Sequence, residues 1–262
     1  MKSSIRASLR YQRDNDDHPL KWAFEEAGGL GFDGLEICMN PAGTRPALAG
    51  SWTTEMLQGT KDLCKTHDMS IFSLSADWAW SFSAFYPTLA GWQGRGVELM
   101  EEDAKLAGDL GAEAILIHFG TSTGNWEDCR ELLKQIAKAG EKHKVVMAYE
   151  ASIWGRLGLG EMETLTKMVQ EVDNPYFGIY LHNWYPRRGK RFHEEIAEAS
   201  GHNLVNPHHF GTVDPPAAEI DWTVASKAVK EHLPGMIATF EISWDVAKEN
   251  KKRLDEIGKE YF

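Results

Sequence analysis

Four side chains of metal-binding type recur at nearly even spacing through the second half of the chain. Their separations are 182 − 150 = 32, 209 − 182 = 27 and 241 − 209 = 32 positions for Glu150, His182, His209 and Glu241. Carboxylate oxygens combined with imidazole nitrogens suit Mn²⁺, Co²⁺, Fe²⁺ or Zn²⁺. If the fold brings the four residues together, they form a site for a divalent metal ion.

Two adjacent histidines are candidates for the third of these four metal-binding residues, in the stretch NPHHFG, residues 206–211. Successive side chains of a strand point to opposite faces. We therefore expect His209 to bind the metal and His208 to be structural, with His208 as the alternative ligand. A single histidine or glutamate after a strand is more often an ordinary loop residue. The regular spacing of the four, and the apolar runs VVMAY and MIATF before the two glutamates, argue against that interpretation.

The elements that must position these residues alternate along the whole chain. Short apolar runs of strand length are followed by amphipathic helical stretches; over 97–110, for example, apolar residues recur every three or four positions. The count is eight strands and eight helices in strict alternation. This pattern and the length of 262 residues predict an α/β fold, a single (β/α)8 TIM barrel over residues 1–262. An open doubly wound sheet is the structural alternative.

The active site of such a barrel lies at the C-terminal ends of the strands. Polar residues at the first four strand ends are Arg10, Glu36, Asp77 and His118. The metal residues follow at the last four ends, so that four consecutive strands deliver them to one rim. We expect Arg10, Glu36 and His118 to contact the substrate there.

Charge and cysteine content exclude several classes of protein. The net charge is −11, with 28 Lys+Arg against 39 Asp+Glu, which disfavours nucleic acid and anionic membrane surfaces. Three widely separated cysteines are typical of reduced thiols in the cytosol. No apolar stretch reaches membrane-spanning length and the N-terminus has no signal-like apolar region. A cytoplasmic protein with no nucleic-acid or membrane partner is expected.

Several motifs resemble a known superfamily in order and spacing over nearly the whole chain. The stretches LGFDGLEICMNP, LGAEAILIHFG, MAYEAS, FGIYLHNWYP and ATFEISW are similar to the xylose isomerase-like TIM barrels, the sugar isomerases and epimerases. The resemblance implies one divalent metal ion on the last four strands, manganese first, with magnesium, cobalt, iron or zinc as alternatives. Glu150, His209 and Glu241 match the family's ligands, and His182 stands where the family usually has aspartate.

Two departures from the family pattern affect the expected chemistry. With His182 as a ligand, two carboxylates around M²⁺ give a neutral set instead of −1, which should strengthen polarisation of a substrate oxygen. With His182 outside the set, three ligands remain. Tyr185 stands where an epimerase usually has a substrate-orienting histidine, and it can donate a hydrogen bond or a proton.

The implied reaction begins with removal of a proton next to the carbonyl of a keto sugar. Glu150 and Glu241 are the expected base and acid, with Tyr185 as a further catalytic residue. Return of the proton to the opposite face of the enediolate gives an epimer, and return to the neighbouring carbon gives an isomer. Loss of a β-substituent instead makes the protein a keto-glycoside lyase or a dehydratase. One alternative is a sugar- or metal-binding barrel subunit without catalysis. Another is a nuclease-like enzyme with several metals, but the further metal-binding histidines that such an enzyme needs are not evident in the sequence.

Aromatic residues near the strand ends could stack on a small-molecule sugar. Trp78 and Trp80 lie in an aromatic segment after the third strand, which predicts either a lid over the substrate or a packing and subunit contact. Trp154 and Trp244 follow the two metal glutamates and would wall the pocket or belong to the core. A homo-oligomer is compatible with this aromatic segment.

Overall fold

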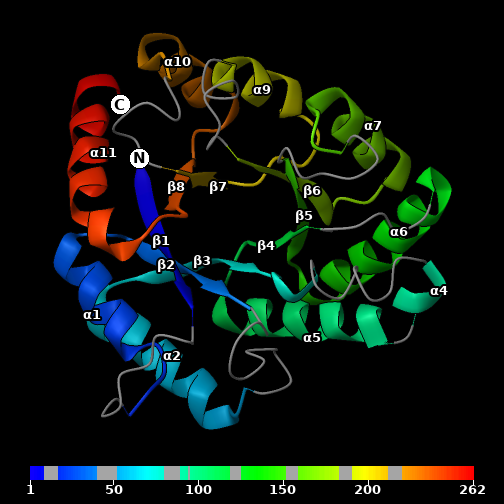
Figure 1. Cartoon of the computed structure of the whole chain (residues 1–262), viewed down its shortest axis with the longest axis horizontal. Helices are drawn as coiled ribbons and strands as arrows, with labels where there is room; N and C mark the ends of the chain where they lie inside the picture. The colour runs from blue at the N-terminus through cyan, green and yellow to red at the C-terminus, as the bar shows by residue number, and fades with distance from the viewer. Residues whose placement is uncertain are drawn as a thin grey trace.

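The computed structural model describes residues 1–8, 17–39, 52–79, 89–93, 95–118, 125–151, 159–182, 191–211 and 220–262. Eight parallel strands form one sheet in the order β6-β5-β4-β3-β2-β1-β8-β7. They are β1 (Lys2–Ser8), β2 (Gly34–Cys38), β3 (Ser70–Ser75), β4 (Ala114–Ile117), β5 (Val146–Ala151), β6 (Phe177–Leu181), β7 (Pro207–Phe210) and β8 (Ile237–Phe240). Figure 1 shows the helices surrounding this ring of strands. The predicted TIM barrel is confirmed.

Helices occupy the connections between the strands. They are α1 (Lys21–Leu30), α2 (Thr54–His67), α4 (Leu89–Trp92), α5 (Arg95–Leu110), α6 (Trp126–His143), α7 (Met162–Val172), α9 (Phe192–Ala199), α10 (Trp222–His232), the short 3-10 helix η4 (Trp244–Val246) and α11 (Ala247–Tyr261). The expected strict alternation is wrong in two places. Both α4 and α5 lie between β3 and β4, and η4 precedes α11.

Helix α6 illustrates how the sequence sets these elements. The side chain of Asn125 caps its first turn by accepting a hydrogen bond of 2.8 Å from the backbone N–H of Asp128. Its buried residues Leu132, Leu133 and Ile136 repeat at helical spacing and face the strands. The helix ends at Lys144, which adopts the left-handed conformation at φ 60°.

The ring closes between β6 and β7 through isolated bridges instead of a continuous ladder of backbone hydrogen bonds. Isolated parallel bridges join Ile179 to Leu204 and His182 to His209. Two backbone hydrogen bonds support them, from Ile179 N–H to Asn203 O and from Val205 N–H to Ile179 O. We refer to this join, made by residues 177–182 and 203–209, as the β6–β7 seam.

Side chains on the two faces of the strands differ in chemistry. The outward faces carry apolar residues such as Ile5, Leu35 and Ile37, which belong to the large core packed under the helices. A smaller apolar cluster consists of Ala114, Leu116, Ala148 and Tyr180, on the alternate positions of β4 to β6, and of Val205, which precedes β7. The corresponding positions of β1, β2, β3 and β8 carry polar residues, and Ser4 donates to Thr239 at 2.8 Å. The barrel lumen is therefore polar on one side, whereas bulky branched residues dominate most such barrels.

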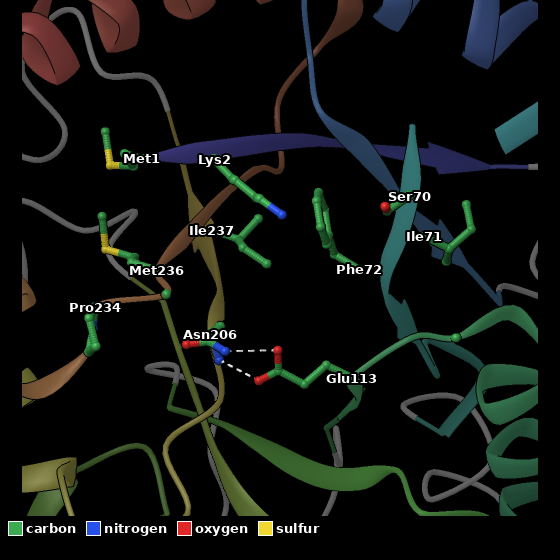
Figure 2. A pocket seen from close by; sticks show the side chains of 12 residues that line it. Met1, Lys2, Ser70, Ile71, Phe72, Glu113, Asn206, Pro234, Met236 and Ile237 are labelled. Carbon is green, nitrogen blue, oxygen red and sulfur yellow. Dashed lines mark hydrogen bonds between the residues drawn. The ribbon is translucent and has the colours of Figure 1, made fainter. Parts of the chain in front are cut away.

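A cavity of about 460 Å³ opens at the N-terminal ends of the strands. Figure 2 shows Met1 and Lys2 on one wall and Phe72 on another, with Asn206 bonded twice to Glu113 at 2.9 Å. Lys2, Ser70 and Ile237 begin or nearly begin their strands, so this mouth lies at the opposite end of the barrel from the strand C-termini.

None of the described helices is both long enough and apolar enough to span a bilayer. None of the three cysteines, all within the described residues, forms a disulfide; Cys38 and Cys129 are buried and Cys64 is half-buried.

Candidate metal centre

The structure brings together the four residues that the spacing singled out. Glu150 belongs to β5, His182 directly follows β6, His209 belongs to β7 and Glu241 directly follows β8. One potential ligand atom from each lies within 4.8 Å of all the others. Because the four strands are parallel neighbours around the ring, their carboxyl ends deliver these side chains to one place.

The distances within the cluster fit a divalent cation. His209 Nδ1 lies 3.0 Å from Glu150 Oε1 and 3.5 Å from Glu241 Oε2. His182 Nε2 lies 3.1 Å from Glu241 Oε2 and 3.8 Å from Glu150 Oε1. Ligands at about 2.0–2.2 Å from an ion stand roughly 3–4.4 Å from one another, so the spacing and the donor types both suit the group.

Access to the cluster is one-sided. Glu150, His182 and His209 are buried, whereas 27% of the Glu241 side chain is exposed. A closed site with four protein ligands is typical of structural metals, and an open side is typical of catalytic ones. The exposure at Glu241 therefore favours a site that a small molecule can reach.

The second oxygen of each cluster glutamate lies beside a residue outside the cluster. Arg6 donates from Nη1 to Glu241 Oε1 and from Nη2 to Asp77. His118 Nε2 lies 3.7 Å from Glu150 Oε2. Each glutamate thus presents one oxygen to the cluster, Glu150 through Oε1 and Glu241 through Oε2.

Electrostatics keeps the cluster glutamates ionised. Burial opposes ionisation of Glu150, but His182, His209 and His118 hold its pKa well below the usual range. Burial likewise opposes ionisation of Glu241, but the charge of His209, the hydrogen bond with His182 and the charge of Arg6 lower its pKa to about 2. Metal ligands must be deprotonated, so both carboxylates are ready to bind a cation.

His209 has carboxylates on both sides of its ring. Burial opposes its protonation, but Glu36 at Nε2 and Glu241 and Glu150 on the Nδ1 side raise its pKa well above the ordinary value. A cation bound in the cluster would compete with the proton at Nδ1, because metal binding releases protons from its ligands.

Glu36 lies against a residue of the cluster. Its side chain is 0% exposed. It accepts hydrogen bonds from Ser73 Oγ and Tyr180 OH, each at 2.8 Å, and its Oε1 lies 2.7 Å from His209 Nε2. The expected substrate contact of Glu36 stays a prediction.

His208 points away from the cluster, as the alternation of β7 predicts. It is fully buried, with its ring 6.0 Å from Phe192 and stacked at 6.4 Å over Phe210. Neither of its ring nitrogens has a hydrogen-bond partner among the residues that the structure describes. His208 is not among the four clustered residues.

The residues that were expected to bind substrate through aromatic rings lie in different parts of the structure. Trp78 is 2% exposed, packs against Trp92 at 5.8 Å and donates from Nε1 to Asp103 at 2.7 Å, so the structure places its ring in the core. Trp244 is half-buried and contacts Trp22 edge-on at 4.9 Å. His118, with 17% of its side chain exposed, stays beside the cluster. Arg10, Trp80, Trp154 and Tyr185 lie outside the described residues.

Residues 24–184, more than half of the chain, match the family described as xylose isomerase-like TIM barrel. The chain belongs to this family. The matched region includes Glu150 and His182, while His209 and Glu241 follow it on the last two strands. No curated protein matches the chain significantly in sequence.

Solved structures similar to this xylose isomerase-like barrel include three that span the whole chain. A 3-keto-D-glucoside 4-epimerase from E. coli in its apo form has a TM-score of 0.71 at 13% identity, covering 98% of this chain and 100% of that one. A D-allulose 3-epimerase from Methylomonas sp. has 0.69 at 15%, covering 100% and 98%. A xylose isomerase domain protein from Planctomyces limnophilus has 0.69 at 14%, covering 99% and 97%. At these identities the likeness establishes the fold.

Sequence reasoning missed three residues of this family member's centre: Arg6, Ser73 and Tyr180. All three lie within strands, at positions that face the lumen. Alternation in KSSIRAS, where Ile5 and Ala7 face outward, would have turned Arg6 inward. The same alternation puts Tyr180 on the face of His182, two residues later.

Proposed function

We propose that this chain is a divalent-metal-dependent epimerase or isomerase that removes a proton next to the carbonyl of a keto sugar. One observation carries the proposal: two carboxylates and two imidazoles converge within 4.8 Å at the carboxyl ends of four consecutive strands, with one side open. The sugar epimerases among the similar structures support the same reaction class.

Glu150, His182, His209 and Glu241 would hold the ion, with Mn²⁺ first and Mg²⁺, Co²⁺, Fe²⁺ or Zn²⁺ as alternatives. A bound divalent ion polarises a substrate oxygen and stabilises the negative charge that develops on it. His182 in place of a carboxylate leaves the formal charge of ion and ligands at zero, which favours this polarisation. The proposal needs one ion per chain.

The two glutamates would move the proton. Both are ionised, so either can accept the proton from the carbon beside the carbonyl. The other glutamate would take up a proton from water and deliver it to the opposite face of the enediolate, while the first glutamate releases its proton to water; this inverts that carbon and yields the epimer. His118, beside Glu150, is positioned to bond a sugar hydroxyl, and Tyr185 is the proposed additional proton donor.

A keto sugar or a 3-keto-glycoside is the proposed substrate. Two of the similar structures are a D-allulose 3-epimerase and a 3-keto-D-glucoside 4-epimerase, and both of these sugars have acidic C–H groups beside a ketone. Elimination of a β-substituent, as in a lyase or dehydratase, starts from the same enediolate. The product of the reaction distinguishes epimer, isomer and elimination product.

The test combines metal analysis with solvent exchange. The purified protein is reconstituted with Mn²⁺, its metal content is measured, and it is incubated in D₂O with a panel of ketoses and 3-keto-glucosides. We expect one ion per chain and deuterium in one substrate. Glu150→Gln and Glu241→Gln should each lower the exchange rate by about 10²–10⁴-fold.

The matched control is Glu163→Gln, which neutralises an exposed glutamate in the first turn of α7. It should leave metal content and exchange unchanged. Bound metal without exchange into any substrate would leave a metal-binding barrel, and failure to bind metal would refute the enzymatic proposal altogether.

A further inference from the structure

Glu36 is a charged residue buried in the lumen next to the metal centre. Its Oε2 accepts hydrogen bonds from Ser73 Oγ and Tyr180 OH at 2.8 Å each. Its Oε1 lies 2.7 Å from His209 Nε2, and Arg6 Nε lies 3.6 Å from the same oxygen. A buried charge requires such partners, and here every one of them also fixes the direction in which the carboxylate points.

This arrangement specifies which nitrogen of His209 keeps its hydrogen when a cation in the cluster replaces the proton on the other. An ionised carboxylate only accepts hydrogen bonds, so the close contact at Nε2 requires a hydrogen on Nε2. A neutral imidazole with its hydrogen on Nε2 has its lone pair on Nδ1. Nδ1 is the nitrogen that faces Glu150 and Glu241 in the cluster, at 3.0 and 3.5 Å.

We propose that Glu36 is a positioning residue of the metal centre: held by Ser73 and Tyr180, it fixes the ring of His209 so that Nδ1 is the metal ligand. The inference rests on the proposed function, because it takes the ion in the cluster as given. It extends that function to a residue on β2, a strand that contributes no member of the four-residue cluster.

The first variant is Glu36→Gln, which keeps the size and removes the charge. The hydroxyls of Ser73 and Tyr180 retain the amide oxygen, so the amide NH₂ is presented to His209 Nε2. An NH₂ group donates, and it therefore favours the opposite tautomer, with the hydrogen on Nδ1. We expect Mn²⁺ to bind about 10–100-fold more weakly than in the wild type, measured by titration of the chelator-treated protein with Mn²⁺ alone.

The control is Asp103→Asn, which also neutralises a buried, hydrogen-bonded carboxylate. Asp103 is 1% exposed and accepts from Trp78 Nε1, and it is not part of the cluster. Mn²⁺ affinity should stay within about 2-fold of the wild type. A loss equal to that of Glu36→Gln would show that any buried carboxylate has the same effect and would overturn the proposal.

A spectroscopic measurement on the wild type needs no variant at all. In the Zn²⁺-loaded protein labelled with ¹⁵N-histidine, long-range ¹H–¹⁵N correlations report which ring nitrogen of His209 is protonated. We expect a proton on Nε2 and a metal-shifted Nδ1. A proton on Nδ1 would overturn the role of Glu36 even if Glu36→Gln failed to fold.

The outcomes separate the two proposals. A wild type that binds no metal refutes the proposed function. A wild type that binds Mn²⁺, with Glu36→Gln folded and equal to it in affinity, refutes only the role of Glu36.

Discussion

His208, on β7, is a polar residue in an apolar environment, beside the rings of Phe192 in α9 and Phe210 in β7. Burial lowers its pKa to about 4, against an ordinary value near 6.5. The unfolded chain therefore binds more protons than the folded one between these values, so the residue destabilises the fold as the pH falls through this window. Replacement by phenylalanine removes the titration and keeps an aromatic ring beside Phe192 and Phe210.

We expect His208→Phe to raise the free energy of unfolding, relative to the wild type, by about 2 kcal/mol more at pH 5 than at pH 7. Urea denaturation of the chelator-treated proteins at both pH values measures this difference. His232→Gln, at the partly exposed end of α10, controls for loss of a histidine. Identical pH dependence in His208→Phe and the wild type would contradict the expectation.

The cluster was predictable because its residues have metal-binding types and stand at strand ends. The functional residues inside the strands were not predictable. Glu150, His182, His209 and Glu241 could be found because parallel strands deliver their ends to one rim. Arg6 and Tyr180 escaped because the lumen of a barrel is normally filled by apolar side chains. The burial of Glu36 and Trp78 depends on which neighbouring strands and helices pack around them, and one-dimensional spacing carries no such information.

At the scale of elements, the β6–β7 seam is the place where the strand ladder is thinnest. Gly178 makes the close approach possible: a Cβ there would lie 2.1 Å from the carbonyl oxygen of Asn203 and 3.0 Å from Val146 Cγ1. Asn203 in turn donates from Nδ2 to Phe177 O at 2.8 Å. The seam therefore depends on glycine at position 178, where any side chain would collide with the backbone of Asn203.

Gly178→Ala should lower the free energy of unfolding by roughly 1–3 kcal/mol, because backbone must move to admit the methyl group. Gly258→Ala is the matched control: it lies within α11 with nothing within 4 Å of the added Cβ, and it should stabilise by about 0.4–1 kcal/mol. Denaturant unfolding of the three proteins decides this. A Gly178→Ala protein as stable as the wild type would mean that the seam yields without strain.

The strands were predictable from their apolar runs, but helix α4 and the thin β6–β7 seam were not. Helix α4 has four residues, Leu89–Trp92, which is too short to show a helical period. The thin seam was also hidden, because pairing at β6 depends on the left-handed turn at Asn203, with φ 53°.

At the scale of the whole molecule, the cluster joins the two sides of the seam. His182 comes from the β6 side and His209 from the β7 side, and they bridge each other directly. A ligand that binds only the folded state stabilises it by about 2.7 kcal/mol at a hundredfold excess over Kd. Metal binding should therefore be a major determinant of the stability of the closed ring.

Adding Mn²⁺ to this excess should raise the unfolding temperature by roughly 5–10 °C for a chain of this size. Hydrogen exchange should slow in β6 and β7 more than in β2 and β3. In His182→Ala, which loses one of the four proposed ligands, the temperature shift should shrink or vanish. Equal protection of all strands would argue against a metal ion at the seam.

Met1 lines the cavity at the opposite mouth of the barrel from the cluster. A chemical tether attached at residue 1 would therefore orient the molecule on a support with its reactive end toward the solution. Ions and sugars should reach the immobilised protein as freely as the dissolved one, so a surface-based biosensor should return the solution Kd for Mn²⁺. An attachment through exposed lysines of the helices would give mixed orientations and lose this advantage.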